Sequence, residues 1–232
     1  MSDISVKAES RSRKASTRIT RHVLVCAPKG GVGKTTISRS LLVCGAQAGL
    51  TILGVDLDPQ RGLTNWAERR EATRRILPDV AAVPAIHMRF STWQPTRFHE
   101  GGPDLVVIDT PPSLGDFSVD VLRICELMDF VVIPLQPSFD DWEQVATWMA
   151  TLRGLGVRAV FQFNQTNPIY KSYSKLLSAA MKVGSVSPRP IPRLEAIHGF
   201  SDRGLTVHDA AGVRGADELG SVFDFVKLEI GL

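Results

Sequence analysis

The sequence predicts a three-layer α/β domain in which helices flank a doubly wound, mostly parallel sheet. Short apolar runs alternate with segments of helical periodicity along most of the chain, which is the pattern of successive βα units. Three of these runs, residues 23–27, 50–55 and 105–108, are followed within three residues by glycines or carboxylates. Because parallel strands end at a common edge, these polar residues should line one crevice there.

The first strand leads into a glycine-rich loop, Lys29-Gly30-Gly31-Val32-Gly33-Lys34-Thr35-Thr36. With so little side-chain bulk, the backbone N–H groups can turn inward around phosphates, and the helix that follows directs its positive end at them. Lys34 adds a charge, and Thr35 supplies the hydroxyl that a P-loop uses to hold Mg²⁺. The loop departs from a strict G-x-x-x-x-G-K-[ST] pattern because Pro28 stands at the first glycine position. The fold should therefore be that of a P-loop NTPase.

Two aspartates follow the strand at residues 50–55, in Asp56-Leu57-Asp58-Pro59-Gln60. Strand alternation points Asp56 and Asp58 in the same direction, so either carboxylate could position Mg²⁺ or a water. Alternatively, Asp58 and Pro59 form only a turn and a helix cap.

The strand at residues 105–108 ends in Asp109, as a Walker B strand does, and this carboxylate should lie near the Mg²⁺ shell. Alternatively, it belongs to a buried strand followed by an ordinary aspartate turn. The adjacent segment 113–118 contains Gly115 and could move with the γ-phosphate.

Further strands are expected at residues 85–90, 129–135 and 157–164. Asn164 ends the last of these, where its amide could pair with a nucleobase edge or simply form a turn. The helix that contains Trp142, Val145, Trp148 and Met149 should use them for core or subunit packing. The helix at residues 215–230 should bury a stripe formed by Leu219, Val222, Phe223, Val226 and Ile230.

Basic residues have two interpretations. The arginine-rich helix at residues 68–75 is more simply a solvated face than a nucleic-acid contact. Later in the chain, a discontinuous basic face could attract phosphates without sequence preference, or its members could be isolated surface residues. They are Lys171, Lys175, Arg189, Arg193, Arg203 and Arg214.

Composition favours one soluble domain over residues 22–232 of the 232-residue chain, preceded by a disordered basic tail at residues 1–21. Residues 1–22 carry a net charge of +4, although the whole chain carries only +3. The tail could contact nucleic acid or act as a solubilising segment. The three cysteines form no C-x-x-C pair, and no apolar run approaches the ~18 residues of a membrane span, so a cytoplasmic protein without membrane contact is expected.

Five motifs in this order and spacing resemble the ParA/MinD family of ATPases with a deviant Walker A loop, across residues 22–230. They are Lys29-Gly-Gly-Val-Gly-Lys-Thr-Thr36, Val55-Asp-Leu-Asp-Pro-Gln60, Leu105-Val-Val-Ile-Asp-Thr-Pro-Pro112, Val132-Ile-Pro-Leu-Gln-Pro137 and Asn164. The segment from Asp58 to Trp66 looks most like the small plasmid-partition ParA proteins. Those proteins lack the helix-turn-helix domain that precedes the loop in larger members. No such domain is expected here, because the first 22 residues leave no room for it.

The resemblance implies a homodimer that sandwiches ATP, with Lys29 reaching the partner's nucleotide and Lys34 and Thr35 binding phosphates and Mg²⁺. Asp58 would orient the attacking water, Asp109 would hold Mg²⁺ through water, and Asn164 would contact adenine. The ATP dimer would bind DNA nonspecifically over the nucleoid. A ParB-like or cargo-linked protein would stimulate an otherwise slow hydrolysis.

The function expected from the resemblance is segregation of plasmid or chromosomal DNA by this Mg²⁺-dependent ATPase cycle. Two alternatives stay open: the same cycle could position a protein cargo, or ATP could only hold a dimer together without being hydrolysed. A membrane-targeting MinD-like role is not expected, because the last eleven residues contain only Lys227 as a cation. Iron–sulfur and tyrosine-kinase relatives need paired cysteines or tyrosine-rich tails that this sequence lacks.

Overall fold

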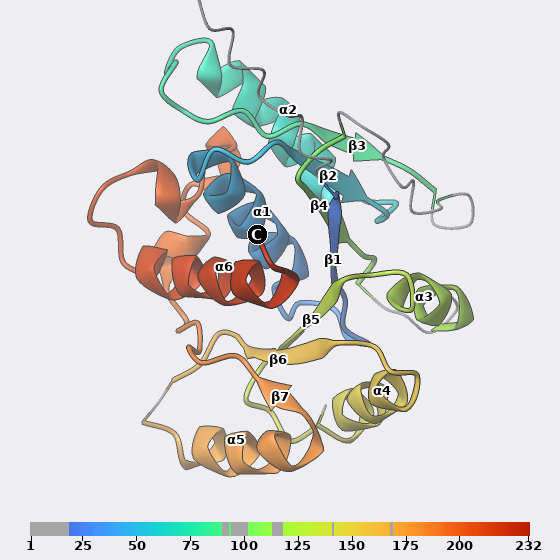
Figure 1. Ribbon diagram of the computed structural model, residues 1–232. Helices are drawn as coiled ribbons and strands as arrows, with labels where there is room; N and C mark the ends of the chain where they lie inside the picture. Colours follow the sequence, from blue (N-terminus) through green and yellow to red (C-terminus); the bar gives the residue numbers. More distant parts are fainter. Residues whose placement is uncertain (1–18, 90–92, 94–101, 113–117, 141, 168) are drawn as a thin grey trace, which may run out of the picture.

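A computed structural model describes residues 19–89, 93, 102–112, 118–140, 142–167 and 169–232 (Figure 1). Seven parallel strands form one sheet in the order β3-β2-β4-β1-β5-β6-β7. The strands are β1 Arg21–Val25, β2 Ile52–Asp56, β3 Ala85–His87, β4 Leu105–Asp109, β5 Phe130–Leu135, β6 Ala159–Phe163 and β7 Ser185–Val186. The helices are α1 Lys34–Gln47, α2 Gly62–Arg74, α3 Ser118–Cys125, α4 Trp142–Gly154, α5 Lys171–Val183 and α6 Ala216–Ile230. This arrangement confirms the predicted fold class.

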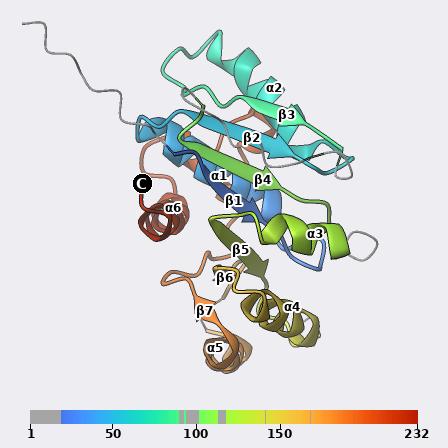
Figure 2. The same ribbon diagram turned by 45° about the vertical axis from the view of Figure 1, so that its right-hand side comes forward.

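Helices cover both faces of the sheet, so the central strands are apolar on both sides. One core joins the sheet to α1, α2 and α6, through residues such as Leu41, Trp66 and Phe223. The other joins it to α3, α4 and α5. Figures 1 and 2 show α1 beside α6 on one face, with α3 and α4 on the other. The chain is thus built in three layers.

The connections diverge at the carboxyl ends of β1 and β4, which are neighbours in the sheet. Helix α1 leaves β1 over one face, whereas α3, which follows β4, lies on the other face. Such a divergence is where open α/β sheets bind ligands. Asp109 of β4 lies opposite Val25 of β1 on one side and Asp56 of β2 on the other, so these three strands end at the same level of the sheet.

Both predicted apolar helix faces are confirmed as core. In α6 the stripe from Leu219 to Ile230 is buried, and in α4 Val145, Trp148 and Met149 are buried. The Trp142 ring packs on Phe161 with centroids 5.8 Å apart. All three cysteines are free thiols, as expected. No helix among the described residues has the length and apolar content that a membrane crossing requires.

The segment between β7 and α6 was not predicted in detail. It folds into three short 3-10 turns, η2 Glu195–Ile197, η3 Ser201–Arg203 and η4 Val207–Asp209. Helix α3 and strand β7 were also not predicted. The basic tail up to residue 18, and most of the segment 113–118 expected to move, lie outside the described residues.

Candidate functional site

The glycine-rich loop turns between β1 and α1 with the geometry expected of a phosphate cradle. Gly31 and Gly33 have φ of +75° and +94°, in the left-handed region that favours glycine. A Cβ on Gly33 would lie 2.0 Å from Nδ2 of Asn164, so the close approach of these two segments also requires a glycine. Gly33 is the N-cap of α1, which places the loop at the positive end of that helix.

Lys34 lies almost fully buried beneath the loop. Its ammonium donates hydrogen bonds to the carbonyl oxygens of Lys29, at 2.8 Å, and Pro112, at 3.2 Å. Burial lowers the pKa of Lys34, whereas the negative charges of Asp109 and Asp58 oppose this effect. The amine is therefore held by carbonyls of the loop and of the segment that follows β4, where a phosphate charge would be stabilised.

Thr35 and Asp109 meet as the sequence predicts. The Thr35 hydroxyl donates to Oδ2 of Asp109 at 2.7 Å, and the Ser38 hydroxyl donates to Oδ1 at 2.9 Å. Asp109 is fully buried, and this desolvation raises its pKa to about 7, against the opposing hydrogen bonds of Thr35 and Ser38. Hydroxyl and carboxylate oxygens are the hard donors that Mg²⁺ prefers, so these residues fit that ion. Sequence reasoning missed Ser38, although it lies one helical turn after Thr35.

Asp56 and Asp58 have different surroundings, which the sequence left undecided. Asp56 is fully buried and accepts the backbone N–H of Leu63 and Thr64, so it caps α2. Asp58 is half-buried, and its carboxylate accepts the N–H of Gln60 at 2.9 Å. The cap is thus Asp56, and the carboxylate that lies nearer to solvent is Asp58.

Asn164 packs directly against the glycine-rich loop. Its Nδ2 donates to the Val32 carbonyl at 2.7 Å, and its Oδ1 accepts the N–H of Gln165. Two further amides not singled out in the sequence, Nε2 of Gln136 and of Gln165, each donate to the Gly31 carbonyl at 3.0 Å. Loops after β5 and β6 therefore fix the loop after β1. The adenine contact of Asn164 stays a prediction.

The Lys29 side chain is exposed at the start of the loop, while its backbone carbonyl accepts the hydrogen bond from the Lys34 ammonium. Its predicted reach to a second subunit stays a prediction. Gly30 packs its backbone against Pro112, since a Cβ there would lie 3.3 Å from Cβ of Pro112. Thr36 follows at the start of α1, beside the loop.

The six predicted DNA-binding residues are all exposed, but they do not gather in one patch. Lys171 and Lys175 lie on α5, which packs at the β7 edge of the sheet. Arg203 lies on η3, and its carbonyl accepts a hydrogen bond from Thr73 of α2, near the opposite edge. Figure 1 shows α5 and α2 at opposite ends of the molecule. A basic surface of this set would have to be discontinuous.

The prediction that the arginine-rich helix presents a solvated face is wrong for Arg70. Its guanidinium is 1% exposed and pairs with both oxygens of Asp209, at 2.7 and 2.8 Å. Burial alone would raise the pKa of Asp209, but its hydrogen bonds and ion pair with Arg70 hold it below the usual value. The guanidinium groups of Arg39 and Arg70 lie over the Trp66 ring, 5.5 and 5.4 Å from its centroid.

Helix α2 thereby holds the segment 201–209 through several hydrogen bonds. Backbone carbonyls of this segment accept from side chains on one face of the helix, namely Ser201 from Arg69, Arg203 from Thr73, Gly204 from Arg70 and Leu205 from Trp66. The segment and α2 should move together.

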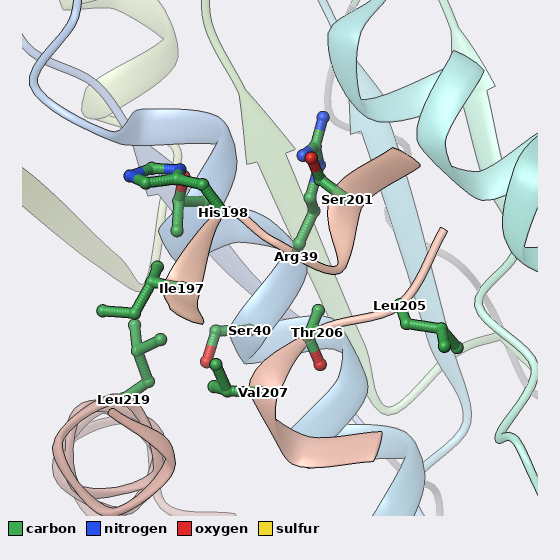
Figure 3. Close-up of a pocket in the computed structure, with 10 residues that line it drawn as sticks. Arg39, Ser40, Ile197, His198, Ser201, Leu205, Thr206, Val207 and Leu219 are labelled. Carbon is green, nitrogen blue, oxygen red and sulfur yellow. The ribbon is translucent and has the colours of Figure 1, made fainter. Parts of the chain in front are cut away.

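A small pocket lies between α1, the segment 197–207 and α6, with a volume of about 20 Å³ (Figure 3). Arg39 and Ser40 line it from α1, and His198, Ser201 and Thr206 line it from the facing segment. It has room for about one water molecule. Of the predicted site residues, only Thr36 lines it.

Comparison with known proteins agrees with this geometry. A family model described as "CobQ/CobB/MinD/ParA nucleotide binding domain" matches residues 23–227. The chain is 33% identical over 157 residues to the chromosome-partitioning ATPase Soj of Thermus thermophilus, which covers 57% of this chain and 61% of that protein. It is also 33% identical over 133 residues to the maintenance of carboxysome distribution protein A of Gloeobacter kilaueensis, covering 53% of this chain and 52% of that protein. The chain thus spans about half to six tenths of the length of these relatives.

Among solved structures, an ATP complex of McdA from Cyanothece superposes with a TM-score of 0.67. The superposition covers 94% of this chain and 98% of that one, at 16% sequence identity. This similarity shows a shared fold.

Proposed function

The chain belongs to the CobQ/CobB/MinD/ParA nucleotide-binding family, and on this basis we propose that it is a Mg²⁺-dependent ATPase that segregates plasmid or chromosomal DNA. The observation that carries the proposal is the arrangement beneath the glycine-rich loop. There Lys34 lies among carbonyls, and the Thr35 hydroxyl lies 2.7 Å from the buried carboxylate of Asp109. A hydroxyl, a carboxylate and an amine at a helix N-terminus form a site for a nucleoside triphosphate with its metal ion.

In this proposal each residue has a separate task. The loop amides from Gly30 to Gly33 and the Lys34 ammonium bind the β- and γ-phosphates and stabilise their charge. The Thr35 hydroxyl contacts Mg²⁺, and Asp109 holds the ion through water. When bound, Mg²⁺ neutralises the charge that develops on the phosphate oxygens.

Three further residues complete the proposed cycle. Asp58 orients the attacking water; its role is supported by its half-buried position just after β2 and by its electrostatic effect on the pKa of Lys34. Asn164 recognises adenine from its position against the loop. Lys29, exposed at the loop entrance, reaches the nucleotide of the second subunit when ATP closes the homodimer.

The ATP dimer binds DNA nonspecifically and so resides on the nucleoid in the cytoplasm. Exposed basic residues from Lys171 to Arg214 supply salt-sensitive contacts to phosphates. Basal hydrolysis is slow, because the switch requires a long-lived ATP state. A ParB-like or cargo-linked protein stimulates hydrolysis and releases the dimer from DNA.

A protein cargo is the second candidate. The support is the 33% identity to a protein named for the maintenance of carboxysome distribution, which equals the identity to the chromosome-partitioning relative. The site residues are the same for either cargo. A binding module that holds ATP without hydrolysis is the third candidate, and turnover measurements separate it from the other two.

The decisive experiment measures retention on DNA with ATP, with ADP and without nucleotide, at two salt concentrations. We expect retention only with ATP, and weaker retention at the higher salt, because the release of counterions from DNA gains less entropy when the surrounding salt is more concentrated. Equal retention in all three nucleotide states would refute the DNA-tethering step.

Two variants test the site itself. Asp58→Ala should keep ATP-dependent dimers but lose turnover, whereas Lys34→Ala should lose nucleotide binding. Asp79→Ala, which changes an exposed aspartate after α2, is the matched control and should match the wild type. Turnover by Asp58→Ala at the wild-type rate would remove Asp58 from its assigned role.

A further inference from the structure

The proposed reaction leaves Asp56 without a task, although its carboxylate is fully buried beside the site. One oxygen, Oδ1, accepts the N–H of Asp58 at 3.0 Å. The other, Oδ2, accepts the N–H of Leu63 at 3.0 Å, and both the N–H, at 2.8 Å, and the hydroxyl, at 3.0 Å, of Thr64. Each carboxylate oxygen has two lone-pair positions, so Oδ2, with three donors, is fully used, whereas Oδ1 has one donor. Most of the acceptor capacity of the Asp56 carboxylate is therefore used by hydrogen bonds within the chain.

These four hydrogen bonds join the two ends of the turn that carries Asp58. The N–H of Asp58 lies just after β2, whereas Leu63 and Thr64 lie in the first turn of α2. The positive end of α2 favours a negative charge at this position. Between the two ends, Arg61 adopts φ +56°, a left-handed conformation that a residue with a side chain adopts only when its surroundings impose it.

The same turn contacts the metal-binding side of the site. Arg39 of α1 donates to the Gly62 carbonyl at 2.8 Å. A Cβ on Gly62 would lie 3.7 Å from the Thr35 methyl group, so the turn packs against the residue that we assign to Mg²⁺. The turn is held by Asp56 from the sheet and by Arg39 from α1.

We propose that Asp56 is a positioning residue for Asp58: its carboxylate fixes the turn 57–62 against α2, so that the Asp58 side chain faces the phosphate site. This inference rests on the proposed function, in which Asp58 orients water. In this proposal Asp56 acts through Asp58 and not by its own contact with nucleotide or metal. Displacing a positioned group by about 1 Å can reduce a rate about 100-fold while binding is kept.

The test is Asp56→Asn in the full chain, because an amide nitrogen cannot accept the N–H groups that the lost oxygen accepted. We expect kcat to fall at least tenfold, while the dissociation constant for ATP with Mg²⁺ changes less than about threefold. With a non-hydrolysable ATP analogue bound to both proteins, the Leu63 and Thr64 amides should exchange hydrogen faster in Asp56→Asn than in the wild type. Thr64→Val removes one of the four hydrogen bonds and should reduce kcat by a smaller factor.

Asp104→Asn is the matched control. Oδ2 of Asp104 accepts the N–H and hydroxyl of Thr51, at 2.8 and 2.7 Å, which is the same pair of bonds that Thr64 gives Asp56. Asp104 precedes β4, at the end of the strand opposite to Asp109. The control should therefore keep the wild-type kcat and the exchange rates of residues 63 and 64.

Wild-type protein and Asp58→Ala are measured beside these variants. Absence of wild-type turnover would refute the proposed function. If the wild type turns over and Asp58→Ala does not, a wild-type kcat in both Asp56→Asn and Thr64→Val would overturn the positioning role. Equal losses of kcat in Asp56→Asn and Asp104→Asn would also overturn it, because a general structural effect would then explain both.

Discussion

Gly204 offers a sharp test of how the segment 201–209 is held on α2. Its φ is +70°, and a Cβ at this position would lie 2.1 Å from N and 2.5 Å from Cα of Arg70. These are backbone atoms in the middle of a helix, so they cannot move aside as the end of a side chain could. Gly212 has the same φ of +70° but no atom within 4 Å of its Cβ position. The two alanine variants therefore share the backbone strain and differ only in the contact with α2.

The expected magnitudes follow from this difference. An alanine in the left-handed conformation costs about 1–2 kcal/mol. Alanine also lowers the conformational entropy of the unfolded chain, which offsets part of this cost, so Gly212→Ala should lower the free energy of unfolding by about 1 kcal/mol. In Gly204→Ala the segment must also withdraw from α2, which breaks four hydrogen bonds worth about 0.5–1.5 kcal/mol each. The total loss should be about 5 kcal/mol, a large part of the ~5–15 kcal/mol of a typical domain.

Urea denaturation measures this comparison directly. With a slope of about 1–3 kcal/mol per molar urea, a difference of about 4 kcal/mol separates the two midpoints by about 1–4 M. The slopes of the two variants should be equal. Midpoints that coincide would refute the tight docking of the segment on α2, and with it the inference that Arg203 moves as part of this helix.

Two further predictions concern the loop and the half-buried His208. Gly33→Ala places a Cβ 2.0 Å from Nδ2 of Asn164, so the loop must shift. Titration with a fluorescent ATP analogue should show at least about tenfold weaker binding. Unchanged affinity would contradict the close packing of these two segments. Burial lowers the pKa of His208 below its ordinary 6.5, with Asp209 opposing. The folded state thus favours the neutral ring, and the stability from this group is fully present above about pH 6.5 and is lost as pH falls through the folded pKa. His208→Gln should therefore flatten the fall in unfolding free energy between pH 7 and pH 5, whereas exposed His198→Gln should keep it; equal slopes in both variants would exclude His208 as the source.

The sequence was sufficient for the sheet and the loop because both depend on local signals. Apolar runs of five or six residues bounded by glycine or aspartate identify buried strands regardless of what packs on them. Glycines at positions with positive φ, such as Gly31 and Gly33, are equally local. Thr35 and Asp109 are far apart in sequence, yet they meet because each lies at a strand–helix junction on the same sheet edge.

The sequence did not predict that Asp56 caps α2 while Asp58 lies nearer to solvent, because this difference depends on where β2 ends. The strand continues to Asp56, and the chain then turns so that α2 begins six residues later, over the Asp56 carboxylate. Periodicity cannot locate a strand end within one or two residues. Arg70 was misassigned for a different reason: its partner Asp209 lies 139 residues away in a segment without a helical or strand pattern.

The buried Arg70–Asp209 pair suggests what α2 contributes beyond stability. Apolar residues of similar volume are often as stabilising as a buried ion pair, but they can pack in several ways. The bidentate geometry, together with the Gly204 carbonyl bound to the same guanidinium, leaves one position for the segment 201–209 on α2. At its other end, α2 begins on the Asp56 carboxylate, next to the turn that carries Asp58. A single helix thus joins the candidate water-orienting residue to the turn that contains Arg203. Any rotation of α2 that accompanies a change at the nucleotide site would therefore also move a basic residue on the molecular surface.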